Sequence, residues 1–343
     1  MRPAIALLAV TVSVTAHTVS TNAAEIRGRA AVPRPIGITH VTVIDVEHGT
    51  RLRDQTIIVE GDRIATIGLS SQVRVPDGYG TVEGRGKFVI PGLIDTHSHL
   101  ARSGDSATTS GSTNHPLEPF VPFGVTTLQE VSSYAIDVAV AALRDTRDRE
   151  APLPRLRVST NVDRWYIASA GAIRPLRGSE GAQDAAFRDS LVSDSLFSDS
   201  LVRLMVERHV WLAPTLVTGS SDGAMRFVRR FHDAGGIVIA GTDGPRPGGA
   251  AMHDEMRLLV AAGLTPAEAL RAATFDAART MGWDKRIGSV VVGKLADLLI
   301  LDADPLLDIR NTARIDAITL GGRFIDGAER QALLDRLTAS RTR

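Results

Sequence analysis

Two histidines, His97 and His99, stand at the end of an apolar run over residues 88–94 that has the character of a β-strand. Side chains two residues apart on a strand point to the same face, so both imidazoles can reach one cation. Imidazole nitrogen is a common ligand of zinc and related divalent ions. Because the chain has no cysteine, a metal site here has to use His, Asp or Glu. The pair therefore predicts a metal site at the carboxyl end of a strand.

Short apolar strands alternate with alanine-rich helices after residue 92. A strand over 124–128 precedes a helix over 136–144, and a strand over 236–240 follows a helix over 225–234. This alternation predicts parallel βα units. In a βα barrel the active site lies at the carboxyl ends of the strands, which is where the two histidines stand. A capping box from Thr265 to Glu268, with Pro266 at the first helical position, predicts a helix that runs to about residue 273.

Residues with β character occur at both ends of the chain, before and after the alternating region. They lie at 38–46, 56–59, 63–67, 289–292, 297–301 and 315–320. The simplest architecture is a small β-domain that both ends build together, with a βα barrel between them. The two end segments must then meet in space.

Several segments resemble the amidohydrolase superfamily, especially its imidazolonepropionase-like and prolidase-like branch. Residues 91–99 (PGLIDTHSH) resemble the first barrel strand of that family, residues 123–127 (FGVTT) the second and residues 240–243 (AGTD) the eighth. Residues 263–270 (GLTPAEAL), 292–298 (VGKLADL) and 302–305 (DADP) resemble its C-terminal stretch. The matches cover roughly residues 38–130 and 200–325, and their combination is more specific than any one motif.

The resemblance implies a Zn²⁺ or related divalent ion that activates a water and polarises a carbonyl group. His97, His99 and Asp243 match the family's ligands, and the family's aspartate also handles the proton of the attacking water. The alternative for Asp243 is a loop or helix-capping aspartate. Glu130 follows the second strand, where family members tend to have aspartate, and is a candidate substrate-binding residue. His253 resembles a family position that either touches the substrate or caps the next helix.

The chain departs from the two-metal members of the family in the middle of the barrel. Those members add a bridging carboxylated lysine or a glutamate, and one histidine each from the fifth and sixth strands. Here no lysine lies between residues 87 and 285, and the histidines between 99 and 243 are His115, His209 and His232. His209 precedes an apolar strand, at the wrong end of the barrel, and His232 lies on a helix. We therefore expect one ion at most.

The length of the barrel region indicates the same departure. Asp243 lies 146 positions after His97, whereas seven βα steps of about 30 residues each would need about 210. The shortfall is about two units. The predicted fold class is thus α/β, with an incomplete or shortened (β/α) TIM-like barrel and a small β-sandwich domain formed by both chain ends.

Composition limits the partners and indicates export. Lys plus Arg equals Asp plus Glu at 39 each, so no net charge favours nucleic acid as a partner. A basic start, an apolar run over residues 4–14 and small-residue exits predict a signal peptide and a periplasmic or secreted protein. The run is too short for a membrane span, and a buried strand is the alternative. The expected parts are a signal peptide (1–24), a linker (25–36), a β-sandwich domain (37–88 and 284–327), a barrel (89–283) and a C-terminal helix or tail (328–343).

Three hypotheses about function follow from these observations. The first is a metal-dependent hydrolase of carbon–nitrogen bonds in a small molecule, such as a cyclic amide or dipeptide, with one ion on His97, His99 and Asp243. The second is a catalytically impaired remnant that acts as a binding or structural protein. The third is a shortened product that does not fold stably, since strands missing from a barrel leave exposed edges. The sequence is compatible with a homo-oligomer and does not identify the substrate.

Overall fold

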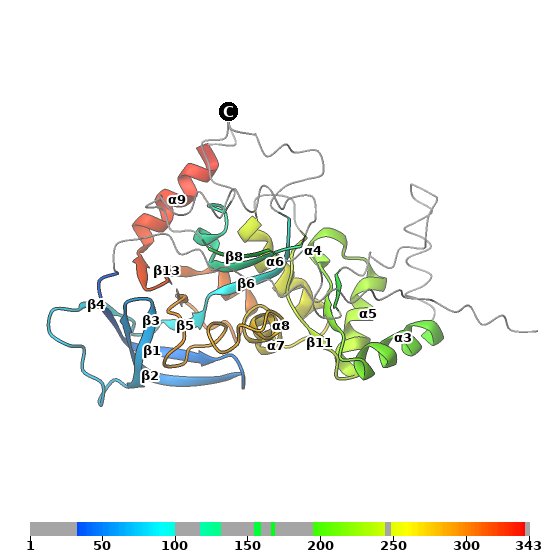
Figure 1. Ribbon diagram of the computed structural model, residues 1–343, viewed down its shortest axis with the longest axis horizontal. Coiled ribbons are helices and arrows are strands. Elements are labelled where there is room, and N and C mark those ends of the chain that lie inside the picture. Colours follow the sequence, from blue (N-terminus) through cyan, green and yellow to red (C-terminus); the bar gives the residue numbers. More distant parts are fainter. Residues whose placement is uncertain are drawn as a thin grey trace, which may run out of the picture.

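The computed structural model describes residues 33–99, 117–131, 154–158, 166–168, 195–243 and 248–339. Figure 1 shows the β-strands of the N-terminal part at one end of the molecule and the helices α3 and α5 at the other. The predicted signal peptide, the helix over 136–144 and His115 lie outside the described residues. No helix in these six ranges combines the length and the apolar character that are needed to cross a membrane.

One eight-stranded sheet contains strands from both ends of the chain, in the order β14-β13-β12-β5-β1-β2-β3, with β4 also paired to β1. Val89 and Ile90 of β5 pair antiparallel with Ile300 and Leu299 of β12, which agrees with the expectation that the two ends meet. The strands are β1 (Ile36–Asp45), β2 (Thr50–Glu60), β3 (Arg63–Leu69), β4 (Gly80–Glu83), β5 (Phe88–Pro91), β12 (Leu298–Leu301), β13 (Ile315–Leu320) and β14 (Arg323–Ile325).

The boundaries of this sheet differ from the predicted ones by a few residues. β1 begins at Ile36, inside the predicted linker, and β5 extends the sheet to Pro91, past the predicted boundary at residue 88. The reason is that β5 pairs on both sides, with β1 and with β12. The division of the β-domain into two stacked sheets stays a prediction.

The centre of the sheet packs on both faces, which explains its continuous apolar sequence. All four residues of β12 are buried. Leu298 and Ile300 belong to the core inside the β-domain, whereas Leu299 and Leu301 belong to the larger core that continues into the barrel region. The sheet therefore forms a fixed base for the strands that carry the histidines.

Two three-stranded parallel sheets form the described part of the barrel region. One contains β6 (Leu93–Ser98), β7 (Val125–Glu130) and β8 (Arg155–Val158), and the other contains β9 (Tyr166–Ala168), β10 (Trp211–Ala213) and β11 (Ile237–Val238). The parallel pairing confirms the βα interpretation of this region.

Residues 239–243, which continue β11, join these two sheets. The amide of Ile239 donates to the carbonyl of Leu212 in β10 (2.8 Å), and the amide of Thr96 in β6 donates to the carbonyl of Ala240 (3.1 Å). The first predicted barrel strand and the last one thus lie side by side. Because both strands end at the same edge, residues at their carboxyl ends are brought together.

Helices cover the strands, and their sequences explain their bounds. The helices are η1 (Val121–Phe123), α3 (Ser195–Glu207), α4 (Leu216–Gly219), α5 (Asp222–Asp233), α6 (Gly248–Ala261), α7 (Pro266–Ala272), α8 (Phe275–Thr280), η2 (Ile309–Ala313) and α9 (Gly327–Ala339). In α5 the buried residues Ala224, Phe227, Val228 and Phe231 recur at helical spacing. The predicted capping box of α7 is confirmed, because Thr265 and Glu268 exchange hydrogen bonds at its first turn.

Candidate metal centre

β6 presents His97 and His99 to one point, as their spacing predicts. The Nε2 atoms of the two rings lie 3.1 Å apart, and the rings stand edge to face with an interplanar angle of 77°. The His97 side chain is 12% exposed and that of His99 32%. The pair is thus mostly shielded on the His97 side and open to solvent on the His99 side.

Asp243 reaches the same point from the neighbouring strand. Its Oδ1 lies 2.8 Å from Nε2 of His99 and 3.5 Å from Nε2 of His97. The amide of Asp243 donates to the carbonyl of His97 (2.7 Å), which fixes its backbone against β6. Asp243 has a φ of 46°, a left-handed conformation that turns the chain at the end of the strand. The three predicted ligands therefore converge.

The close approach of the two strands depends on Gly241. A Cβ at this position would lie 2.7 Å from Cβ of His97 and 3.0 Å from its backbone nitrogen. Any larger residue would push the last strand away from β6. Glycine is required here for proximity, and this proximity sets the distance from Asp243 to the histidines.

The donor atoms fit a tetrahedral divalent ion. One ligand atom from each of His97, His99 and Asp243 lies within 4.8 Å of the others, and this is the group with metal-binding geometry in the described part of the chain. Zinc bonds of about 2.0–2.1 Å to tetrahedral ligands separate those ligands by about 3.3–3.4 Å. The measured separations of 3.1, 3.5 and 2.8 Å lie around that value. Three protein ligands leave a fourth position open, as in catalytic zinc sites.

The charges of the cluster are strongly coupled. Burial acts to raise the pKa of the Asp243 carboxyl, but hydrogen bonds and charges of His97 and His99 outweigh it and hold that pKa well below its usual range. The hydrogen bond to Asp243 in turn raises the pKa of His99, against the opposing effect of burial. An ionised carboxylate facing two imidazoles is a suitable environment for a divalent cation, which would bind between these three groups.

Asp95 on β6 hydrogen-bonds to residues on both strands of the centre. The sequence did not predict this role. It is fully buried and accepts the hydroxyl of Thr242 at Oδ2 (2.6 Å) and the amides of Thr242 (3.0 Å) and His97 (3.1 Å) at Oδ1. Burial raises the pKa of Asp95 to about 6, although these hydrogen bonds act to lower it. Asp95 thus joins β6 to the last strand directly beneath the ligands. Its position two residues before His97, on the same strand face, is the signal that could have found it.

Glu130, a predicted substrate-binding residue, is fully buried at the end of β7. Its Oε1 lies 3.9 Å from Nδ1 of His99, on the side of the ring away from Asp243. This separation is longer than a hydrogen bond, so the carboxylate acts on the His99 ring through its charge, which helps to raise the pKa of His99. Contact with a substrate stays a prediction.

His253, the other predicted substrate-binding residue, has partners within the protein on both ring nitrogens. Nε2 lies 2.9 Å from the carbonyl of Phe123 and Nδ1 lies 3.0 Å from the hydroxyl of Thr312. Burial lowers the pKa of His253 to about 4, so the ring is neutral near pH 7. These contacts link α6 to η1 and η2 and indicate a packing role, because neither ring nitrogen is left to bind a substrate.

The sequence did not predict His209 and His232 as metal ligands, and both lie outside the cluster of His97, His99 and Asp243. His209 stands before β10, at the amino end of the strand, and His232 on α5 pairs with Glu268 at 3.2 Å.

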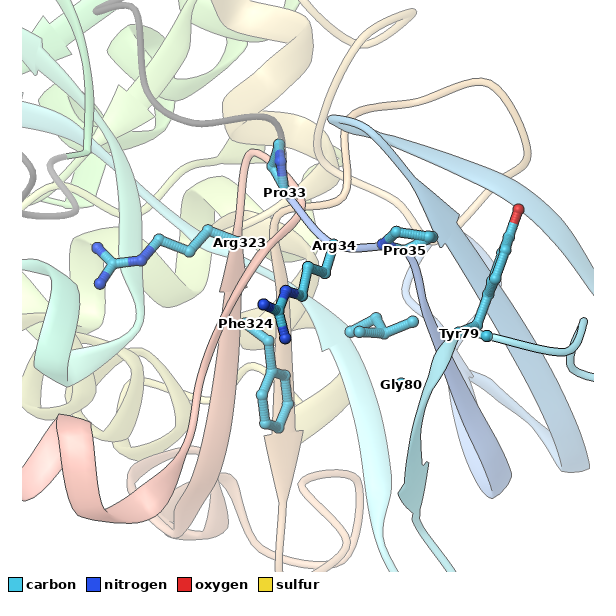
Figure 2. A pocket seen from close by; sticks show the side chains of 9 residues that line it. Pro33, Arg34, Pro35, Tyr79, Gly80, Arg323 and Phe324 are labelled. Carbon is cyan, nitrogen blue, oxygen red and sulfur yellow. The ribbon is translucent and has the colours of Figure 1, made fainter.

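A separate pocket of about 770 Å³ lies beside the β-sheet and is lined by Arg34, Tyr79, Arg323 and Phe324. Figure 2 shows the Arg34 side chain beside the Phe324 ring, with Tyr79 on the far wall. None of its lining residues belongs to the cluster.

Comparison with known proteins connects this geometry to a family. A model of the amidohydrolase family matches residues 178–325. Imidazolonepropionase of Rubrobacter xylanophilus is 26% identical over 351 residues, which cover 72% of this chain and 84% of that protein. Imidazolonepropionase of Streptomyces avermitilis is 43% identical over 54 residues, and this match spans only 13% of that protein.

Solved structures show the same fold. A phenylurea hydrolase B structure superposes with a TM-score of 0.66 at 20% identity, covering 86% of this chain and 97% of the other. A Xaa-Pro dipeptidase structure with bound methionine superposes with a TM-score of 0.64 at 16% identity, covering 85% of this chain and 100% of the other. These similarities show a TIM-like barrel fold with mixed sheets.

Proposed function

Because the chain belongs to the amidohydrolase superfamily, we propose that it is a metal-dependent hydrolase of carbon–nitrogen bonds in small molecules. The observation that carries this proposal is the convergence of His97, His99 and Asp243 at the edge where the first and last described barrel strands meet. Cyclic amides and dipeptides are the substrates to test first, since similar proteins include imidazolonepropionases and a Xaa-Pro dipeptidase.

A divalent ion, most simply one Zn²⁺, would supply Lewis acidity and lower the pKa of a water at the open fourth position. The side chains have distinct roles around it. His97 and His99 would hold the ion through Nε2, and the charge of Glu130 would act on the His99 ring. Asp243 would serve as a ligand and would accept the proton of the attacking water through its carboxylate. Asp95 and Thr242 hold both strands in register beneath these groups.

Only one ion is proposed, because the group with metal-binding geometry in the described part of the chain has three residues and the bridging lysine of two-metal relatives is missing. No lysine lies between residues 87 and 285. In two-metal relatives both ions stabilise the negative charge of the transition state. Here a single ion would have to do so, and we therefore expect slower turnover. Sharing its charge with the ion also makes Asp243 a weaker base. The proposed barrel is shortened by about two βα units, in a secreted or periplasmic protein.

A non-catalytic remnant is the second candidate, and the missing lysine favours it. Metal analysis and hydrolysis assays separate the two candidates. The purified chain, His97→Ala, Asp243→Ala and the matched surface control His48→Ala would be assayed for bound zinc and for hydrolysis of acyl-dipeptides, lactones and cyclic amides. We expect about one zinc per chain and slow hydrolysis, both lost in the first two variants and retained in the control.

Three other results would contradict the proposal. Two ions per chain would show that further ligands exist outside the described residues. Zinc binding without hydrolysis, or no zinc binding in any variant, would favour the remnant.

A further inference from the structure

The turn after β10 lies beside the strand that carries Asp243. β10 pairs in parallel with β11, and Ile239 extends this pairing by its hydrogen bond to Leu212. Thr215, just past the carboxyl end of β10, has a φ of 48°. A left-handed conformation is strained for a β-branched residue and persists only where its surroundings impose it. Contacts with neighbouring residues must therefore hold this turn in its conformation.

Glu255 on α6 is the side chain that holds it. Its Oε2 accepts the backbone amide of Val217 at 2.8 Å, in the first turn of α4. Glu255 is fully buried, and its Oε1 has no hydrogen-bond partner among the described residues. The buried hydroxyl of Thr215 has none among them either. A buried polar group without a partner is costly, so this arrangement is not one that packing alone would select.

The protonation state of Glu255 follows from its surroundings. Burial raises the pKa of Glu255 to about 8, the amides of Val217 and Leu216 act to lower it, and the charge of Asp95 raises it further. The carboxyl group is therefore uncharged near pH 7. Because Oε2 accepts an N–H group, the proton of the uncharged form would lie on Oε1. Glutamine has nearly the same shape, and its carbonyl oxygen can accept the Val217 amide while its NH₂ group takes the place of the carboxyl O–H.

No described cation compensates a charge on Glu255. Asp95 on β6 faces it, and neither α4 nor η1 carries an ionisable side chain. His253, on the same helix, contacts Phe123 and Thr312. Most charged groups on the other elements that pack against α6, and the remaining pair on α6 itself, have partners of their own: Asp254–Arg257, Arg229–Asp233, Arg230–Asp199, His232–Glu268, Arg271–Asp276 and Arg310–Asp308. Asp222 and Arg226 of α5 are exposed to solvent.

We propose that Glu255 is a positioning residue of the metal centre: its carboxyl group fixes the turn at residues 215–217 against α6, beside the strand that leads to Asp243. The turn is linked to the strand that leads to Asp243 through β10, because the amide of Ile239 on that strand donates to the carbonyl of Leu212. The inference deepens the proposed function, since it assigns a residue to the support of that same centre.

The test compares Glu255→Gln, Glu255→Leu and the neighbouring control Asp254→Asn, whose carboxylate is 59% exposed. Chelator-treated proteins would be titrated with Co²⁺ at pH 7, and hydrogen exchange would be followed in a peptide covering residues 214–220. We expect Glu255→Gln and the control to bind Co²⁺ within twofold of the unaltered protein. Glu255→Leu should bind at least tenfold more weakly and should lose protection of the Val217 amide.

A pH series gives a readout that does not depend on metal. The folded-state pKa of Glu255 lies above its unfolded value, so its stability contribution is full below about pH 4.5 and is lost as pH rises towards 8. The melting temperature of the chelator-treated protein should therefore fall from pH 6 to pH 9 by more than that of Glu255→Gln.

The outcomes distinguish failure of this inference from failure of the proposed function. Equal Co²⁺ affinity and equal exchange in Glu255→Leu and the unaltered protein would overturn the positioning role. Glu255→Gln as weak as Glu255→Leu would show that the ionised carboxylate is needed, which also overturns it. If the unaltered protein binds no Co²⁺, the proposed function fails. The Glu255 role then stands only if Val217 exchange and the pH series both behave as expected. If Glu255→Leu does not fold, Glu255→Gln and its pH series decide.

Discussion

Nε2 of His99 lies 2.8 Å from Oδ1 of Asp243, although one residue follows the first described barrel strand and the other follows the last. This contact spans the junction between the two strands. It places an imidazole directly beside a carboxylate. As a result, Asp243 raises the pKa of His99, and His99, together with His97, lowers the pKa of Asp243.

The coupling predicts the behaviour of Asp243→Asn in chelator-treated protein. Since Asp243 raises the pKa of His99, the substitution should lower that pKa, as measured by NMR titration of the ring. The pair stabilises the fold at pH values above the unfolded pKa of the aspartate and below the folded pKa of the histidine. The variant should thus lose about 0.5–1 kcal/mol at pH 5.5 and less at pH 9. Asp45→Asn, which removes the surface partner of His48, should leave the His99 titration unchanged.

Gly241→Ala should disrupt the metal centre through the backbone. The new Cβ would lie 2.7 Å from Cβ of His97, and neither strand can move without breaking the hydrogen bonds that join them. We expect about 1–3 kcal/mol of lost stability and at least tenfold weaker Co²⁺ binding. Gly219→Ala is the control, because nothing lies within 4 Å of its Cβ. Unchanged Co²⁺ affinity in Gly241→Ala would show that the strand spacing is not critical.

His253→Ala separates a packing role from a substrate role. Loss of the contacts to Phe123 and Thr312 should destabilise the protein by about 2–4 kcal/mol while leaving Co²⁺ affinity within twofold. The pKa of His253 is lowered to about 4, so its stability contribution is full above about pH 6.5 and is lost as pH falls through 4. The variant should lack that acid-dependent loss in thermal unfolding. A raised KM with unchanged stability would instead support the substrate role.

Asp297→Ala should uncouple the β-sheet from the barrel region. The Asp297 carboxylate pairs with Arg155 of β8 and accepts the amide of Gly321 next to β14. The substitution removes a mostly buried ion pair and the acceptor of the Gly321 amide, at a cost of about 3–5 kcal/mol. Chemical denaturation would measure this cost. Asp308→Ala, which breaks a local pair with the exposed Arg310, should cost less than about 1 kcal/mol.

The two histidines could be predicted because their signal is local. Strand spacing alone places His97 and His99 on one face, and the capping box of α7 likewise depends on four consecutive residues. Asp243 needed the family resemblance in addition, because a lone aspartate after a strand has several ordinary roles. The meeting of the chain ends followed from their shared β character.

Other features depend on contacts between distant segments, which no local pattern records. The burial of Glu255 and its bond to Val217 exist only because α6 packs on the turn after β10. His253 illustrates the same limit, since its family position indicated either a substrate contact or a cap, whereas its ring joins η1 and η2. The shortened barrel, the signal peptide and the export of the protein stay predictions.

The junction between residues 93–99 and 237–243 also has a consequence for synthesis of the chain. The histidines leave the ribosome well before Asp243, so a nascent chain holds two ligands without the third until almost the whole barrel region has been made. Contacts between such distant segments form late in folding. A metal ion captured early would be bound by imidazoles alone, and only the arrival of the last strand would complete the site. If the proposed metal site is correct, we expect it to be completed only in the finished chain, so ion availability after folding, rather than during translation, should determine how many molecules hold an ion.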